Sequence, residues 1–418
     1  MKKIMKVTMA VAGVCIVAGL GLSLAGYAMG GEPGFWIGRN GMYTNQQARN
    51  LNAEKLVELE KTKIDPFTSM DVRVNYNGIK IKPSEDDSYY LEYHLYIRNK
   101  EPEYTVKNGI LSFTCVPEPT NSETWGSAGF LVIEGSYVHD REDGSVTIYV
   151  PKDTLMDAVK LYTSDNSVIY DGPDTKTLDI TSKYGSIDLN GIKAETAYFT
   201  ASDGTIHCDS GTFTSLDIIN KYGETDLNSI EADRLDIDAS DSQIVLKDIV
   251  SRNITVTNKY GSVKGSAVVA DSLTMKQSDG SCDIRMADIK NGDFENKYGD
   301  ITLELTGAEK DYNFDLMMKY GDINLNGRNT SEKDLRENNG ADKNITMTAN
   351  DGSMRILTKK WGENATPKSL RRAGGGRGQT NKRVLVSSVA GSKAERQEKR
   401  ADRANYGELL KDFSSVST

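Results

Sequence analysis

Apolar and polar residues in the middle of the chain repeat with a period of 19 residues. The motif Lys-Tyr-Gly begins at Lys183, Lys221, Lys259 and Lys297, and a motif of the Ser-Asp-Gly type lies midway between the copies. One position of the repeat is occupied in turn by Asn166, Gly185, Gly204, Gly223, Ser242, Gly261, Gly280 and Gly299. A unit this short cannot bury its own apolar side, so we expect the units to stack on one another.

Alternation within each unit predicts two clear β-strands and a shorter third segment. Apolar residues follow the repeat position by two and four residues, and again by twelve and fourteen residues. The third segment is indicated by Ile192, Ile230, Ile249 and Val268. We therefore predict an all-β fold, a single-stranded parallel β-solenoid with about 19 residues per turn, whose regular turns span residues 164–305. Because parallel crossover connections are nearly always right-handed, we expect a right-handed β-helix.

The whole solenoid domain is predicted to span residues 64–358. Alternation between residues 70 and 115, and again from 144 to 150, indicates further strands before the regular turns. The period breaks after Gly299, because the next Lys-Tyr-Gly motif comes only at residues 319–321. The polar stretch 326–344 that follows is expected to project from the coil as a loop.

The N-terminal segment Val7–Met29 is long and apolar enough to cross a membrane as a helix, since its 23 residues carry no charge. Lysines precede it, so the positive-inside rule predicts that residues 1–30 form a cytoplasmic stub and a single transmembrane anchor, with the rest of the chain outside the cell membrane. A cleaved signal peptide is the alternative, because Gly26-Tyr27-Ala28 offers small residues at a cleavage spacing. Residues 31–63 are expected to form a spacer with one short helix between Asn52 and Lys63.

Charge divides the chain into an acidic body and a basic end. Residues 359–418 contain 14 Lys or Arg against 6 Asp or Glu, and residues 7–358 carry a net charge of −20. We expect the basic end to be a disordered tail, which either attracts anionic lipid or wall polymer or only keeps the chain soluble. An acidic body repels nucleic acid, so no nucleic-acid partner is expected.

Cysteine and histidine offer no convincing chemistry. Cys208 and Cys282 lie four turns apart, about 19 Å in a parallel stack, which is too far for a disulfide. Both fall on inward positions, where we expect buried free thiols. His207 and Cys208 are adjacent, so on a strand they point to opposite faces and cannot share a metal. We predict no metal, no cofactor and no catalytic residues.

The Lys-Tyr-Gly corners offer a candidate binding surface. They place a column of tyrosines along the solenoid, alternating turn by turn with aspartates, at intervals of about 10 Å. The column consists of Tyr184, Tyr222, Tyr260, Tyr298 and Tyr320. Such a column can stack against sugar rings; in the alternative interpretation Tyr only covers the corner while Gly supplies the bend and Asp caps the turn. A catalytic site is usually singular, whereas Asp203, Asp241 and Asp279 recur in every second turn.

Several features together resemble a bacterial family of membrane-anchored putative adhesins, a domain of unknown function that includes LiaG-like envelope proteins. They are the apolar anchor after Met-Lys-Lys, the strand GSVTIYVPKDTLMDAVKLYTSDNSV, and repeated turns such as KYGSIDL and KYGDITL. The resemblance covers about residues 64–358. It implies a β-solenoid outside the cell membrane, linked to envelope-stress systems, and it implies no catalytic residues. The basic tail departs from the family pattern.

We therefore expect a non-enzymatic cell-envelope protein that presents its solenoid for adhesion, or for interaction with a wall polysaccharide or an envelope protein. The chain would be held in the bacterial cell membrane through residues 7–29, with its body extracytoplasmic. An accessory role in envelope-stress signalling is the alternative, and a carbohydrate-active enzyme on a β-helix scaffold is the third hypothesis. The residues predict neither the oligomeric state nor the partner.

Overall fold

A computed structural model describes residues 2–30, 35–38, 41–43, 55–97, 100–116, 124–128, 144–330 and 333–360. The helix α1 spans Lys2–Ala28. Within it, Val7–Gly26 has a mean hydropathy of 2.2, so it is long and apolar enough to cross a membrane, and the signal-peptide alternative meets the same test. A separate small antiparallel sheet joins β2 (Gly41–Tyr43), β1 (Phe35–Gly38) and β9 (Thr124–Ala128). Of the predicted basic tail, residues 361–418 lie outside the described residues.

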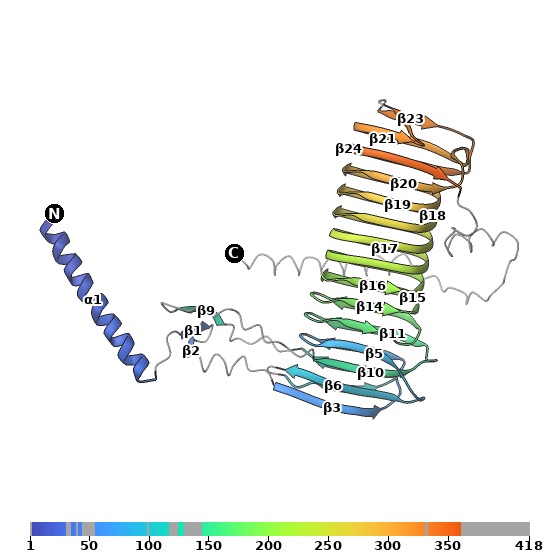
Figure 1. Cartoon of the computed structure of the whole chain (residues 1–418). Helices are drawn as coiled ribbons and strands as arrows, with labels where there is room; N and C mark the ends of the chain where they lie inside the picture. Colours follow the sequence, from blue (N-terminus) through green and yellow to red (C-terminus); the bar gives the residue numbers. More distant parts are fainter. Residues whose placement is uncertain are drawn as a thin grey trace. The chain divides into compact units, whose positions relative to one another are not determined.

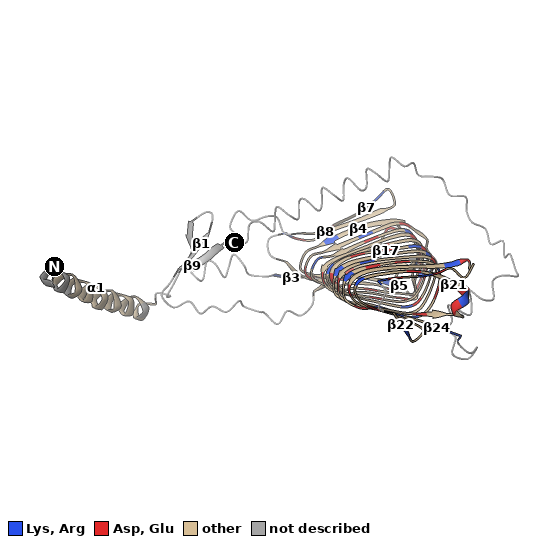
Figure 2. Cartoon of the chain, turned by 90° about the horizontal axis from the view of Figure 1, so that it is seen from above, with Lys and Arg blue, Asp and Glu red and all other residues tan. Residues whose placement is uncertain are grey.

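All other strands belong to one continuous sheet that coils into a solenoid (Figure 1). Its central strands are β10 (Ser145–Pro151), β11 (Met156–Thr163), β12 (Val168–Tyr170), β13 (Thr175–Ser182), β14 (Ile187–Asn190), β15 (Lys193–Asp203), β16 (Ile206–Asp209), β17 (Thr212–Tyr260), β18 (Val263–Asp279), β19 (Cys282–Tyr298) and β20 (Ile301–Thr306). Along the axis the coil forms closed loops around its interior, and charges of both signs are distributed around the outside (Figure 2).

The predicted period of 19 residues is the register of the parallel pairing. Ile187 pairs with Ile206, and Ile206 pairs with Thr225. The same offset joins Ile244 to Val263 further along the stack. All of these side chains are fully buried, so like residues stack above one another and close a dry interior. The predicted all-β parallel solenoid is confirmed, while its right-handedness stays a prediction.

The N-terminal strands form a cap that departs from the sequential coil. They are β3 (Lys55–Ile64), β4 (Ser69–Val74), β5 (Gly78–Ser84), β6 (Tyr89–Ile97), β7 (Glu103–Lys107) and β8 (Ile110–Cys115). β10 inserts between β5 and β6, parallel to the first and antiparallel to the second. β3 and β7 then cover the ends of the two faces as antiparallel strands.

The short helix expected in the spacer is wrong, because residues 55–64 form β3. Leu, Glu and Lys gave this stretch a helical composition, but its pairing with β6 decides the conformation. Val57 and Leu59 face the core, and a bulge between Leu59 and Thr62 restores the alternation that brings Ile64 inside. Tertiary pairing therefore overrides local propensity here.

The C-terminal end also departs from sequential order. It contains the 3-10 helix η1 (Glu309–Asp311), β21 (Tyr312–Leu325), β22 (Arg328–Thr330), β23 (Asp334–Glu337) and β24 (Lys343–Lys359). β24 pairs in parallel with β19 and β20 on one side and with β21 on the other. The chain thus forms its outermost turn first and then returns to fill the position beneath it.

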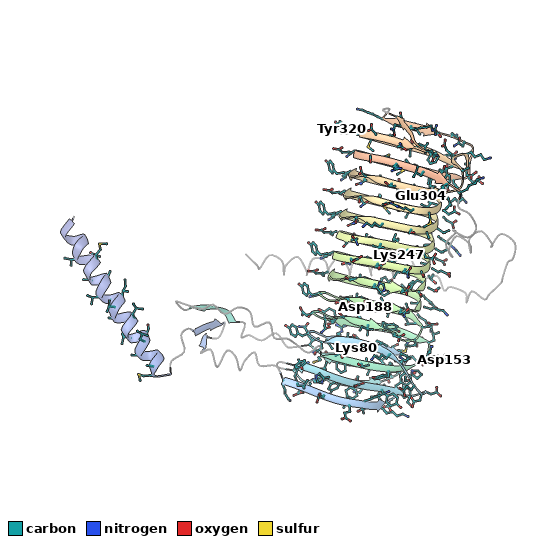
Figure 3. All side chains as sticks on the ribbon, in the orientation of Figure 1. Lys80, Asp153, Asp188, Lys247, Glu304 and Tyr320 are labelled. Carbon is teal, nitrogen blue, oxygen red and sulfur yellow. The ribbon has the colours of Figure 1, made fainter. Side chains whose placement is uncertain are left out.

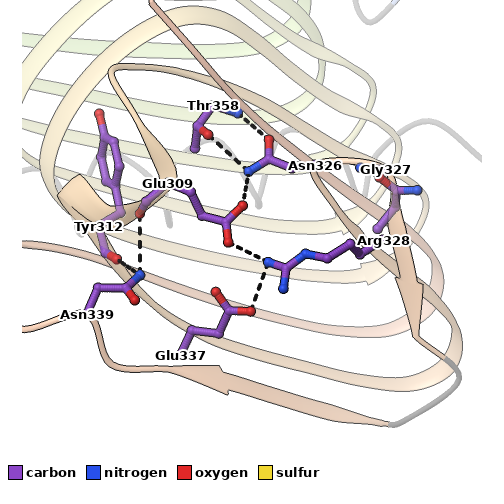
Figure 4. A network of polar contacts seen from close by, with 9 residues as sticks. Glu309, Tyr312, Asn326, Gly327, Arg328, Glu337, Asn339 and Thr358 are labelled. Carbon is purple, nitrogen blue, oxygen red and sulfur yellow. Dashed lines mark hydrogen bonds and ion pairs between the residues drawn. The ribbon is translucent and has the colours of Figure 1, made fainter.

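The predicted projecting loop at 326–344 is therefore wrong. Its strands β22 and β23 pair antiparallel with β21 and cover the last turn. A polar network fixes this arrangement (Figure 4): Arg328 contacts Glu309 at 2.5 Å and Glu337 at 2.9 Å. Asn326 donates to Thr358 Oγ1 at 3.0 Å and thereby joins the loop to β24. These side-chain contacts explain why the polar segment 326–344 packs on the last turn and does not project from it.

Candidate functional site

The most regular exposed feature of the solenoid is the corner formed by each Lys-Tyr-Gly motif. The structure places all five predicted tyrosines on the surface, with between 56% and 62% of each residue exposed. Tyr320 extends from the edge of the stack near its C-terminal end, whereas Asp188, Lys247 and Glu304 lie on its broad face (Figure 3). We call the line of corners from Asp165 to Tyr320 the corner row.

Glycine follows most of the corner tyrosines and aspartates, and these corners stack very closely. A Cβ atom built on Gly280 would lie 1.9 Å from the carbonyl oxygen of Gly261, the equivalent residue one turn away. Gly280 also has a φ of +122°, which L side chains rarely adopt. Backbone hydrogen bonds hold adjacent corners together, as between the Gly280 amide and the Tyr298 carbonyl at 3.0 Å. The row is therefore a rigid part of the backbone.

Buried amides support the corners from inside, and the sequence analysis missed them. Asn258 Nδ2 donates to the carbonyl of Ser242 at 2.8 Å, and Asn296 Nδ2 donates to that of Gly280 at 2.8 Å. Gln277 makes the equivalent bond to Gly261 at 3.1 Å. These contacts satisfy carbonyl groups at the bend. The available signal was Asn at the same place in the repeat, two residues before Tyr222, Tyr260 and Tyr298.

Tyrosine and aspartate alternate along the corner row in space. Asp203 lies beside Tyr222, and Asp279 lies between Tyr260 and Tyr298. At the C-terminal end, Asp351 of β24 lies between Tyr298 and Tyr320. The inserted strand therefore preserves an alternation that the sequence alone loses after Gly299.

A half-buried ion pair marks where β24 enters the stack. Lys343 Nζ contacts Asp288 Oδ1 at 2.5 Å and lies 5.0 Å from the centre of the Tyr312 ring. Burial by itself lowers the pKa of Lys343, but the bond to Asp288 and the nearby Tyr312 outweigh it and the pKa is raised. The lysine therefore stays charged and ties β24 to the turn beneath it.

Several charges on the broad faces are paired between neighbouring turns, whereas the charges of the corner row make no such pairs within the described residues. Arg234 contacts Asp217 at 3.0 Å, Arg252 contacts Asp233 at 3.2 Å, and Lys176 contacts Asp157 at 2.6 Å. Within the described part of the chain, neither an ion pair nor a side-chain hydrogen bond is made by the following corner residues: Lys183, Lys221, Lys259, Lys297, Asp203, Asp241, Asp279 and Asp351. The row thus presents uncompensated charges of both signs to its surroundings.

Histidine and cysteine behave as expected from the strand geometry. Cys208 is fully buried while the neighbouring His207 faces outward, 3.7 Å from Asp226. All four cysteines are free, and burial raises the pKa of Cys208 to about 12 and that of Cys115 to about 11. Among the residues that the structure describes, no group of three or more His, Cys, Asp or Glu could hold a metal ion.

Comparison with known families identifies the domain. Residues 67–357 and 229–391 match the family described as Toastrack DUF4097, which covers most of the chain. The chain belongs to the Toastrack DUF4097 family. Toastrack domains are solenoid-like β folds of unknown function, so the family resemblance inferred from the repeated turns is confirmed. A search of curated proteins gives no match.

Solved structures similar to this Toastrack chain include three bacterial proteins named for adhesion. A putative adhesin from Bacteroides fragilis NCTC 9343 is 15% identical, with 59% of this chain and 98% of that chain covered and a TM-score of 0.25. A putative adhesin from Parabacteroides distasonis ATCC 8503 is 11% identical, with coverages of 73% and 95% and a TM-score of 0.31. A putative cell adhesion protein from Clostridium sporogenes ATCC 15579 is 12% identical, with coverages of 73% and 99% and a TM-score of 0.16.

Proposed function

We propose that this Toastrack protein is a non-enzymatic adhesion or interaction protein of the bacterial cell envelope. Its apolar helix α1 would anchor it as a single pass, with the lysines at the start of the helix on the cytoplasmic side and the solenoid outside. The names of the similar structures refer to adhesion, which supports an envelope protein in general terms.

The corner row is the observation that carries this proposal. Its tyrosines are exposed, its charges are unpaired within the described residues, and its backbone is held rigid by close stacking. Exposed aromatic rings on a rigid support bind a partner with little loss of conformational entropy. Either a wall polysaccharide that stacks on the rings or an envelope protein with matching charges would suit such a row.

The test is adhesion of cells that display the full-length chain. Replacing Tyr222, Tyr260 and Tyr298 with Ala should lower attachment to wall fragments or to other cells by about tenfold, because the aromatic contact area is lost. The matched control replaces Tyr104, Leu155 and Ile169 with Ala, since these residues are also exposed but lie off the row. Equal attachment by the two variants would contradict the proposal.

The enzyme hypothesis is tested on the same protein. Purified full-length chain is incubated with wall polysaccharides, and products are followed by chromatography. Turnover that disappears in an Asp241→Asn variant would overturn the non-enzymatic assignment.

The signalling alternative depends on the anchor. Gly13, Gly19 and Gly26 of α1 have open space where a Cβ would lie, which allows close packing against another membrane helix. Exchanging α1 for a poly-Leu span should leave adhesion unchanged if the corner row carries the function. Loss of an envelope-stress response in that variant would instead favour the signalling role.

A further inference from the structure

Lys-Tyr corners and Asp corners alternate along the corner row, so the row read from its other end has the opposite kind of corner at every position. From the N-terminal side, the corners are Asp165, Tyr184, Asp203, Tyr222, Asp241, Tyr260, Asp279, Tyr298, Asp351 and Tyr320. A lysine precedes every one of these tyrosines, and a small or neutral residue precedes every aspartate. The row begins with one kind of corner and ends with the other, so the reversed order exchanges the two kinds at every position.

Two copies of the row placed antiparallel are therefore complementary along their full length. Each Lys-Tyr corner of one copy faces an Asp corner of the other, which brings an ammonium group and a phenol hydroxyl to a carboxylate. Glycine follows three of the five aspartates, at Gly204, Gly280 and Gly352, and leaves room there for the facing ring. A twofold axis relates the copies, so the interface is closed and uses the same patch on both.

Neighbouring corners within one chain do not neutralise these charges. The broad faces show that this fold readily pairs charges between turns, as Lys247 does with Asp226 at 3.6 Å. The corner lysines and aspartates make no such pair within the described residues. On the N-terminal side of Asp165 the next corner is Tyr76, which is half-buried and follows the neutral Asn75. The alternation of charged corners therefore ends at Asp165.

We propose that the partner of the corner row is a second copy of this chain, bound antiparallel through alternating Lys-Tyr and Asp corners. This inference rests on the proposed adhesive function and names its partner. The row is roughly 45 Å long at about 4.8 Å per turn. The row is narrow, and each exposed ion pair contributes little to the binding free energy, so a single pair of molecules binds weakly. Adhesion therefore depends on many copies in each membrane.

The test uses full-length protein reconstituted into phosphatidylcholine vesicles, with vesicle clustering followed by light scattering. A row that is acidic along its middle is made by changing Lys221, Lys259 and Lys297 to Glu, and a row that is basic along its middle by changing Asp203, Asp241 and Asp279 to Lys. Either variant alone should cluster at least tenfold more slowly, because like charges face each other. Mixing the two vesicle populations should restore clustering.

Two controls distinguish charge complementarity along the corner row from a general effect of net charge. Changing Lys160, Lys264 and Lys290 to Glu alters the net charge equally at exposed positions off the row and should leave clustering unchanged. Raising the salt concentration should slow clustering of the parent protein, since exposed ion pairs are screened. Circular dichroism of each variant checks that the solenoid is folded.

Deletions test the alternation independently of charge. Removing residues 204–241 takes out two turns and keeps the alternation, whereas removing residues 204–222 takes out one turn and places like corners opposite each other in the middle of the row. Complementarity predicts that the shorter deletion impairs clustering more. A dependence on row length alone predicts the reverse and would contradict the inference.

The outcomes distinguish a failure of the second-copy proposal from a failure of the proposed adhesive function. If the acidic and basic variants are not restored by mixing, while the Tyr→Ala variant still loses attachment to wall fragments, the partner is a glycan and the second copy is excluded. If no change in the corner row affects either clustering or attachment, the proposed function itself fails.

Discussion

At the scale of single residues, the corner glycines differ from the other residues with left-handed backbone. Ser229 and Met286 have φ values of +56° and +53° at the opposite bend of the coil, where a side chain is accommodated. At the corner glycines Gly261, Gly280 and Gly299, by contrast, the space for a Cβ is occupied by the carbonyl oxygen of the adjacent turn. The requirement for glycine there comes from stacking as well as from the dihedral angle.

Replacing Gly280 with Ala should therefore destabilise the protein by about 3 kcal/mol, since both the close contact and the positive φ oppose a Cβ. The measurement is chemical unfolding in detergent, followed by circular dichroism. Gly191→Ala is the control, because Gly191 has a φ of +67° but nothing within 4 Å of the added Cβ. It should cost only about 1 kcal/mol, and equal losses in the two variants would contradict the stacking argument.

At the scale of elements, β24 is the strand on which the C-terminal end depends. It pairs on both edges, with β19 and β20 below it and β21 above it. β21, β22 and β23 reach the rest of the solenoid through this strand and the network around Glu309 and Asn326. Weakening β24 should therefore loosen everything beyond it.

Replacing Ile345 in β24 with Ala should cost about 3 kcal/mol, because the side chain is fully buried between neighbouring turns. Hydrogen exchange should accelerate in β21 and β24 and stay unchanged in β14 and β16, since each turn contacts only its neighbours. Ile187→Ala removes the same atoms from the middle of the stack and should give the opposite distribution. Uniform acceleration in both variants would show that the solenoid unfolds as one unit.

At the scale of the whole solenoid, both ends are covered by antiparallel strands. β3 and β7 cover the N-terminal end, and β22 and β23 cover the C-terminal end. An uncovered parallel coil would present unpaired backbone groups that another chain could extend. The caps therefore keep the stack at a defined length.

Replacing residues 328–337 with a Gly-Ser linker of equal length should produce larger assemblies, because the edge of β21 is then free to pair with another molecule. Size-exclusion chromatography with light scattering in detergent measures the mass. The same linker inserted after Asp153, in the turn between β10 and β11, is the control and should leave the mass unchanged. Unchanged mass in the first variant would show that the cap is not needed to block association.

The regular turns were predictable because every repeat unit carries the apolar positions that set the register of its pairing. A 19-residue period with inward Ile187, Ile206 and Ile244 fixes which residues stack, and the exposed tyrosines follow from the same offset. The two ends were not predictable in this way. Residues 55–64 have helical composition and residues 326–344 are polar, yet both form strands because an exposed edge of the sheet offers them hydrogen-bond partners.

The sequence by itself determined the repeat, the buried columns and the chemical identity of each corner, since these depend only on side chains at fixed intervals. The tertiary structure alone decided that β24 enters beneath β21 and places Asp351 between Tyr298 and Tyr320. The physical reason is that a parallel turn selects its neighbours by matching backbone and buried side chains, and it does so regardless of their order along the chain. The alternation along the corner row is consequently a property of the folded stack at its C-terminal end.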